Sequence, residues 1–201
     1  RKLPVFFKHR FRISWSKIEE VSDVQDIQHP TIKAYLNHIN KSGFEFIHSG
    51  DLPARSGIGS SSAFAAALVN LIGRLGGQSL THRHIAMESI LLERSIMGEA
   101  GGVQDQIACS HGGFNQIRLN NRVDYEIDNI KIEDQALCEF ESSLMLFFTG
   151  VTRNSYHNAK KHEDGLRENY SELVEITEIT ETALKVFENN FVSKIINEIN
   201  Q

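Results

Sequence analysis

Residues 50–62 read GDLPARSGIGSSS, and from Ser60 onward the apolar residues recur at helical spacing. Glycines let a backbone approach an anion closely, and the free amide groups at the start of a helix point toward it. The serine hydroxyls add donors and can supply an oxygen ligand to Mg²⁺. The stretch lacks both the Gly-Lys-Ser end of a P-loop and the Gly-x-Gly-x-x-Gly of a dinucleotide fold. We predict that this loop holds a phosphate group; an ordinary helix cap with a glycine turn is the alternative.

Strands and helices are expected on both sides of this loop. Period-two patterns predict strands at residues 4–7, 11–15 and 44–47, and Pro30 opens an amphipathic helix that ends near Gly43. Further helices are predicted for residues 60–75, from behind the N-cap Thr81 to about residue 98, and between the glycine pairs 101–102 and 112–113. Strands follow near residues 114–118, 123–130 and 143–148, and the pattern is helical from residue 157 onward.

Glu93 falls on the apolar side of the predicted helix behind Thr81. Ala86, Ile90 and Met97 share that side, at offsets of seven, three and four residues. Burying an unpaired carboxylate is costly, so a partner is expected. A metal ion is one such partner, and a salt bridge to a neighbouring helix is the other.

Asp105 follows the glycine pair Gly101-Gly102 near the start of a short predicted helix. The helix dipole favours the charged form of an acid at that position. An ionised aspartate at a glycine turn is suited to accept or orient the proton of a nucleophilic hydroxyl, as kinases commonly use one. The alternative is a first-turn acid that only stabilises its helix.

Taken in order, these three elements resemble the GHMP kinases. Residues 53–63 are similar to the second motif of that family, Pro-x-x-x-Gly-Leu-Gly-Ser-Ser-Ala-Ala, with two mild substitutions, and residues 93–98 resemble the segment whose glutamate holds Mg²⁺ together with a serine of the loop. The resemblance implies that Ser60 and Glu93 hold Mg²⁺, with Ser61 as an alternative serine, and that Asp105 is the catalytic aspartate. It also implies an ATP phosphate site at Pro53, Arg55, Ser56, Gly57, Ile58, Gly59, Ser60, Ser61 and Ser62.

Within that family, residues 101–106 and 112–115 look closest to the D-glycero-D-manno-heptose 7-phosphate kinases, and residues 148–153 are similar to them as well. By that resemblance, the chain phosphorylates the anomeric oxygen of a sugar phosphate on the way to a nucleotide-activated sugar for surface polysaccharide. Gly101, Gly102 and Arg153 are then expected near the substrate. Arginine suits bidentate phosphate recognition, so Arg153 or Arg55 is a candidate for a substrate phosphate, with an exposed ion pair as the alternative for each.

The implied fold is α+β. Residues 1–135 would form the GHMP kinase N-terminal, ATP-binding domain, which is similar to ribosomal protein S5 domain 2, and residues 136–201 the beginning of a ferredoxin-like C-terminal domain. The first and third motifs of the family have no counterpart in this sequence, so we expect a fragment that is incomplete at both ends.

The amino-acid composition limits the kinds of binding partner and the cellular location that we expect. The 201 residues are 40% hydrophobic and carry a formal net charge of −5 with no basic stripe, so neither nucleic acid nor an RNA-binding S5-like role is expected. No apolar run reaches the roughly 20 residues of a membrane span, and the two distant cysteines fit a reducing cytoplasm. The sequence leaves open a homodimer, another acceptor such as galactose, fucose or a mevalonate-like acid, and a non-catalytic sugar- or nucleotide-binding regulator on the same fold.

Overall fold

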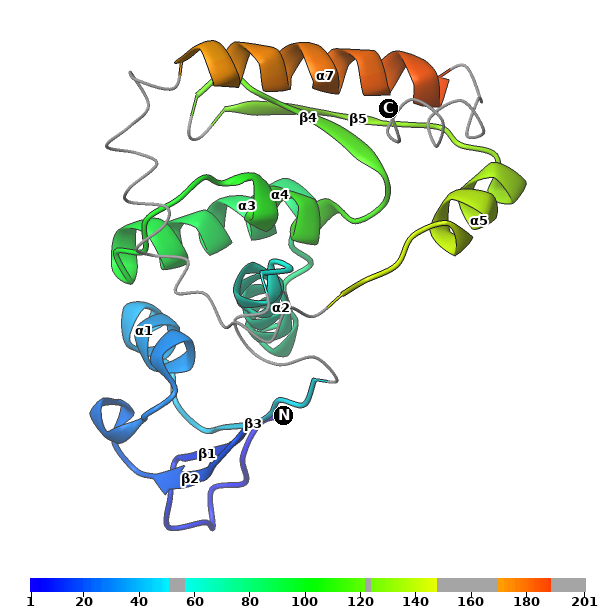
Figure 1. Cartoon of the computed structure of the whole chain (residues 1–201). Helices are drawn as coiled ribbons and strands as arrows, with labels where there is room; N and C mark the ends of the chain where they lie inside the picture. Colours follow the sequence, from blue (N-terminus) through cyan, green and yellow to red (C-terminus); the bar gives the residue numbers. More distant parts are fainter. Residues whose placement is uncertain (51–56, 122–123, 148–169, 189–201) are drawn as a thin grey trace. The chain divides into compact units, whose positions relative to one another are not determined.

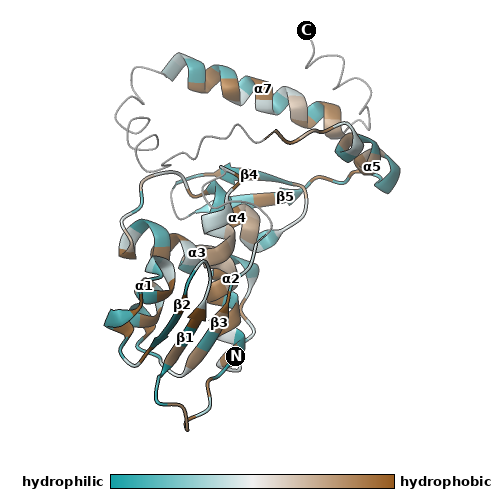
Figure 2. Cartoon of the chain, turned by 60° about the horizontal axis from the view of Figure 1, so that its bottom comes forward, coloured by the Kyte–Doolittle hydropathy of each residue, from teal (hydrophilic) through white to brown (hydrophobic). Residues whose placement is uncertain are grey.

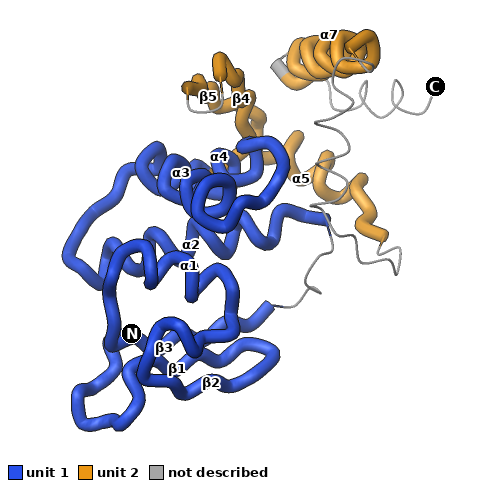
Figure 3. The backbone as a smooth tube through the Cα atoms, turned by 90° about the vertical axis from the view of Figure 1, so that its left-hand side faces the viewer, with its two compact units in different colours: residues 1–111, 152–156 blue, residues 112–151, 157–201 orange. Residues whose placement is uncertain are grey.

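Two compact units make up the part of the chain that the structure describes. The structure is a computed structural model, and it describes residues 1–50, 57–121, 124–147 and 170–188. The described residues up to His111 form unit 1, and those from Gly112 onward form unit 2 (Figure 3). The domain boundary predicted at residue 135 stays a prediction.

Unit 1 is built on a three-stranded sheet. Its strands are β1 (Phe11–Ser14), β2 (Ile18–Val21) and β3 (Phe44–Ile47), in the order β2-β1-β3 (Figure 1). β1 runs antiparallel to β2 and parallel to β3. The return from β2 to β3 passes through a short 3₁₀ turn, η1 (Val24–Asp26), and α1 (Pro30–Ile39).

The other helices of unit 1 follow the loop. They are α2 (Ser60–Leu75), α3 (His82–Ile90), the π-helical segment η2 (Leu91–Ile96) and α4 (Gln104–His111). Hydrophobic residues of β1, β3 and α2, brown in Figure 2, belong to one core with those of α1 and η2. Fully burying a side chain such as Ile13, Ile32 or Leu92 stabilises the fold by roughly 1.5–3 kcal/mol.

Unit 2 pairs a hairpin with helices. β4 (Asn115–Leu119) and β5 (Tyr125–Asn129) are antiparallel, and α5 (Asp134–Ser142) and α7 (Tyr170–Glu188) belong to the same unit. The rings of Phe114, Phe140 and Phe187 contact one another at centroid distances of 4.9 to 6.4 Å, so aromatic contacts join the start of the hairpin to both helices.

Most predicted elements are present. The strand at residues 44–47, the helix at 60–75 and the N-cap role of Thr81, whose hydroxyl accepts from the amide of His84, are confirmed. The helix opened by Pro30, the short helix after Gly102 and the strands near 114–118 and 123–130 are also confirmed, within a few residues. For the helix predicted from residue 157, α7 confirms residues 170–188, and the rest lies outside the described residues.

Two predicted strands are wrong, and one strand was missed. Residues 4–7 form a turn, closed by a hydrogen bond from the amide of Phe7 to the carbonyl of Pro4, and the side chain of Phe6 is 79% exposed. Residues 143–147 follow α5 without forming a strand, and Phe148 lies outside the description. The missed strand is β2, whose two central residues are glutamates, a type depleted in strands.

The N-cap residue of α1, His29, belongs to an aromatic cluster that includes a residue of α2. The ring of His29 lies 4.9 Å from those of Trp15 and Phe64, and its Nδ1 accepts a hydrogen bond of 3.4 Å from the amide of Ile32. That cap requires a neutral ring nitrogen. Burial, and then the nearby His48, lower the pKa of His29 below the ordinary value of 6.5 for a histidine.

The cap at His29 should make stability depend on pH. Because its pKa is lower in the folded chain than in the unfolded chain, the unfolded chain binds more protons as the pH falls below about 6.5. The free energy of unfolding should therefore be highest above that pH and should decrease as the pH drops through the lowered pKa. His29→Asn keeps a capping acceptor without a titrating group, so denaturant unfolding from pH 7.5 to 5 should show a flatter dependence.

The matched control is His84→Asn, which removes an exposed imidazole from α3 and leaves the α1 cap intact. This control should retain the full wild-type loss on acidification. An equally steep loss in His29→Asn would show that another group is responsible.

Candidate active site

Two left-handed glycines set the start of α2. Gly57 and Gly59 have φ values of 81° and 72°, and Gly59 is the N-cap residue, with no side chain bonded to the first amides of the helix. Ser60 and Ser61 are exposed there. The first turn of α2 therefore presents amides and hydroxyls suited to an anion. Pro53, Arg55 and Ser56, predicted for the same site, lie outside the described residues.

Asp105 lies directly beside this helix start. It is an exposed residue in the first turn of α4, and its carboxyl group is 3.6 Å from the position that a Cβ on Gly59 would occupy. A side chain at position 59 would thus contact the carboxylate, and glycine leaves that space open. The structure brings together the serine loop and the aspartate, which are more than 40 residues apart in sequence.

Glu93 is buried on the inner side of the same helices. It belongs to η2, where the amide of Met97 bonds to the carbonyl of Leu92, five residues back, and it is 2% exposed. π-Helical turns of this kind occur frequently at functional sites. The inward position predicted from its apolar neighbours is confirmed.

The hydroxyl that contacts Glu93 belongs to Ser62. Ser62 Oγ donates to Oε2 of Glu93 at 2.8 Å, and Nε2 of Gln106 donates to the same oxygen. Ser62 is the third residue of α2, whereas Ser60, the serine predicted to share a metal with Glu93, is the first residue and is exposed. The metal role of Ser60 stays a prediction.

Glu93 has other titratable groups nearby, whose pKa values are affected by its charge. Burial, and then the charges of Asp105 and Glu93, raise the pKa of the Cys109 thiol. Burial and the charge of Glu93 raise the pKa of Glu99, against a smaller opposing effect of Arg94. Among the described residues Glu93 forms no ion pair, and a buried ionised carboxylate without an oppositely charged partner is energetically costly.

A carboxylate and hydroxyls are the oxygen donors that Mg²⁺ prefers. Within the described ranges no group of three acids, histidines or cysteines is placed to hold a metal. Mg²⁺ characteristically binds through one or two carboxylates together with substrate phosphates, so Glu93 of η2 and a serine hydroxyl of α2 fit it without a group of three such side chains.

Arg94 holds the glycine turn that leads to Asp105. Its guanidinium donates to the carbonyls of Gly102 at 2.8 and 3.1 Å, Ala100 at 2.9 Å and Glu99 at 3.2 Å. The turn includes Gly101 at φ 128°. Arg94 was not among the site residues predicted from the sequence. The available signal was an arginine directly after Glu93 and a few residues before a glycine turn, because a guanidinium can donate to several backbone carbonyls of such a turn.

The substrate roles predicted for Gly101 and Gly102 are untested by this geometry and stay predictions. A Cβ on Gly102 would come within 2.1 Å of Oε1 of Gln104, the end of a flexible side chain. Arg153 lies outside the described residues.

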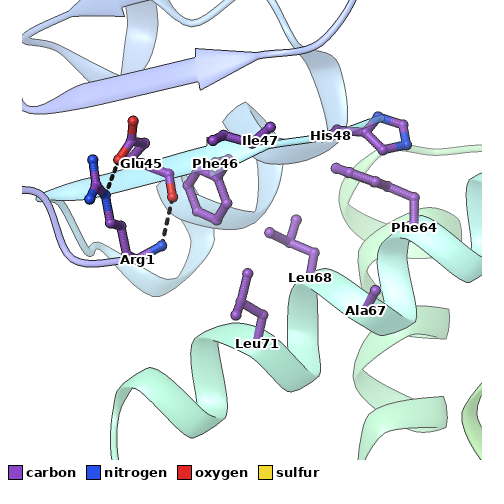
Figure 4. A pocket seen from close by; sticks show the side chains of 9 residues that line it. All are labelled: Arg1, Glu45, Phe46, Ile47, His48, Phe64, Ala67, Leu68 and Leu71. Carbon is purple, nitrogen blue, oxygen red and sulfur yellow. Dashed lines mark hydrogen bonds and ion pairs between the residues drawn. The ribbon is translucent and has the colours of Figure 1, made fainter. Parts of the chain in front are cut away.

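An apolar cavity lies elsewhere in unit 1, and neither Glu93 nor Asp105 lines it. It has a volume of about 380 Å³ between β3 and α2, and Figure 4 shows Phe46, Leu68 and Leu71 along it. Arg1 pairs with Glu45 at one end, and the ring of Phe64 contacts His48 at the other. We therefore do not count this cavity with the site at the start of α2.

Comparison with known proteins identifies similar chains. A family model described as the GHMP kinases N terminal domain matches residues 27–113. A D-glycero-alpha-D-manno-heptose 7-phosphate kinase of Campylobacter jejuni is 28% identical over 141 residues, which cover 70% of this chain and 41% of that protein. A bifunctional fucokinase/GDP-fucose pyrophosphorylase of Arabidopsis thaliana is 28% identical over 119 residues, which cover 58% of this chain and 11% of that protein. The chain thus spans less than half the length of either relative.

Solved structures share the fold. A D-glycero-D-manno-heptose 1-phosphate kinase from Bacteroides thetaiotaomicron superposes with a TM-score of 0.62 at 21% identity, covering 81% of this chain and 57% of that one. A protein from Campylobacter jejuni described as a sugar kinase superposes with a TM-score of 0.56 at 22% identity, covering 81% and 56%. The predicted family resemblance and the α+β class are confirmed.

Replacing Arg94 should loosen the turn before Asp105. Arg94→Met keeps the apolar stem and removes every donor, so the free energy of unfolding should fall by about 1.5–3 kcal/mol, the typical range for hydrogen bonds to a charged group. Amide hydrogen exchange in residues 98–103 should accelerate. Arg94→Lys should recover only part of the loss, because an ammonium cannot reproduce the planar fork.

Arg74→Met is the matched control, since among the described residues the side chain of Arg74 donates one exposed hydrogen bond, to Asn70 on α2. It should change stability by no more than about 0.5 kcal/mol. Full recovery by Arg94→Lys would contradict the role given to the fork.

Proposed function

We propose that the protein to which this chain belongs is an ATP-dependent sugar kinase, a phosphotransferase with an alcohol group as acceptor, because residues 27–113 match the model of the GHMP kinases N terminal domain. The observation that carries the proposal is the proximity of Asp105 to Gly59 at the start of α2. A group able to orient a hydroxyl then lies next to amides able to hold a phosphate. A non-catalytic binding module has no need of that aspartate.

We assign phosphate binding and activation of the acceptor hydroxyl to different residues of this chain. In this proposal, the amides and hydroxyls of Gly59, Ser60 and Ser61 bind the β- and γ-phosphates of ATP, with residues 53–58 completing the loop. Asp105 accepts the proton of the sugar hydroxyl or orients it for attack on the γ-phosphorus. Phosphoryl transfer leaves little covalent work for the protein, so positioning and charge compensation account for most of the catalysis.

Glu93 is the proposed protein ligand of Mg²⁺, together with a serine hydroxyl from α2. When bound, the ion would supply positive charge that compensates the charge developing on the transferred phosphoryl group. The support from this structure is a buried carboxylate whose described partners, Ser62 and Gln106, are both neutral.

The proposed acceptor is D-glycero-D-manno-heptose 7-phosphate, phosphorylated at its anomeric hydroxyl for nucleotide-sugar and surface polysaccharide synthesis. The support is the likeness to a heptose 7-phosphate kinase and the glycine turn at residues 101–102 that resembles the same group. Arg153 is proposed to contact the sugar phosphate. Use of ATP and of a soluble sugar phosphate implies a cytoplasmic location.

Asp105→Asn should test the assignment of the aspartate. If Asp105 takes the proton, kcat should fall by about 10²- to 10⁴-fold, while the KM for ATP changes little, because the amide keeps the shape and loses the base. The measurement is ATP-dependent phosphorylation by the full-length protein, with the heptose 7-phosphate, galactose, fucose and mevalonate as parallel acceptors.

Asp134→Asn is the matched control, since Asp134 is also a first-turn acid but belongs to α5 in unit 2. It should retain wild-type turnover. Near-normal turnover by a folded Asp105→Asn would remove Asp105 from the mechanism, and turnover with none of the acceptors by the wild type would contradict the proposed function.

A further inference from the structure

Gln106 is buried more completely than a glutamine usually is. It is 0% exposed, and its amide nitrogen donates to Oε2 of Glu93. Gln106 follows Asp105 directly in the first turn of α4. One of these neighbours is a carboxylate of the site, and the other contacts the second carboxylate, that of Glu93. Asp105 faces Gly59 on the exposed side, and Gln106 faces Glu93 on the buried side.

The carboxylate fixes the orientation of this amide. A glutamine turned over would place its carbonyl oxygen against the carboxylate of Glu93, and two acceptors would then repel each other. The amide nitrogen must therefore face Glu93. As a result Oε1 of Gln106 is buried, and among the described residues it has no hydrogen-bond partner. A buried acceptor without a partner destabilises the fold, so local stability alone does not explain a glutamine at this position.

The two donors to Glu93 hold its carboxylate without neutralising it. Ser62 from α2 and Gln106 from α4 bond to the same oxygen, and both are buried. An arginine or lysine in place of Gln106 would form an ion pair with Glu93 and compete with any bound cation. Neutral donors fix the direction of the carboxylate and leave its charge available.

On the basis of the proposed function, we infer that Gln106 is a positioning residue: with Ser62, it holds the carboxylate of Glu93 in the orientation that binds the cation accompanying the nucleotide. Partners of this kind, which contact a metal ligand and not the metal, change metal affinity by roughly 10- to 100-fold when they are removed. Neither residue needs to touch ATP or the sugar.

The test is the dependence of nucleotide binding on Mg²⁺, measured by calorimetry with ADP on the full-length protein. Gln106→Met removes both the donor and the unpartnered acceptor at similar volume, so its melting temperature should stay within about 4 °C of the wild type. Binding of ADP without metal should be unchanged. The Mg²⁺ concentration required to enhance ADP binding should rise by about 10-fold, and Ser62→Ala should shift it in the same direction.

Ser110→Ala is the matched control. Ser110 lies one turn further along α4, and its hydroxyl donates to the backbone carbonyl of Gln106 and not to Glu93. It should leave the Mg²⁺ dependence unchanged.

Three outcomes would overturn the inference. Equal weakening of ADP binding with and without Mg²⁺ would assign Gln106 a purely structural role, and an unchanged Mg²⁺ requirement in Gln106→Met would remove its link to the cation. In both cases wild-type turnover would leave the proposed function standing. A wild-type protein that binds ADP equally well with and without Mg²⁺ would contradict the inference and the metal site of the proposed function together.

Discussion

A buried carboxylate is the constraint on which the site depends. Glu93 is 2% exposed and carries a charge that its described neighbours do not compensate. Its two hydrogen-bond donors come from α2 and α4, so both helices must keep their register relative to η2. The same register places Asp105 at Gly59. The arrangement of the surface groups is therefore tied to a polar contact in the interior.

Local patterns were enough to predict the elements that carry this site. Helical spacing behind Thr81 placed Glu93 on the buried side, and the glycines at 57 and 59 predicted a helix start open to an anion. Both are properties of a few neighbouring residues: side-chain periodicity and the backbone freedom of glycine. The strand at residues 44–47 was found for the same reason, since aromatic and β-branched residues alternate there with a glutamate.

The contacts between helices could not be predicted this way. Ser62 and Glu93 are 31 residues apart, and Glu93 and Gln106 are 13 apart, so no local period relates them. The serine chosen from the sequence was the first of the helix, whereas the hydroxyl that reaches inward is two residues later. Residue propensities also failed to predict β2, because its two central residues are glutamates. Tertiary contacts stabilise this strand: Glu19 is buried and accepts a hydrogen bond from Trp15.

The π-helical turn of η2 has a consequence for how this sequence tolerates insertions and deletions. Its hydrogen bond from Met97 to Leu92 accommodates one residue more than an α-helix would. Removing one residue of η2 before Glu93 would restore an α-helical turn and rotate Glu93 by about 100° relative to α3, while the residues after η2 would keep their positions. The carboxylate of Glu93 would then no longer face Ser62 and Gln106. Substitutions on the exposed side of this helix are compatible with the site, whereas a change in its length is not.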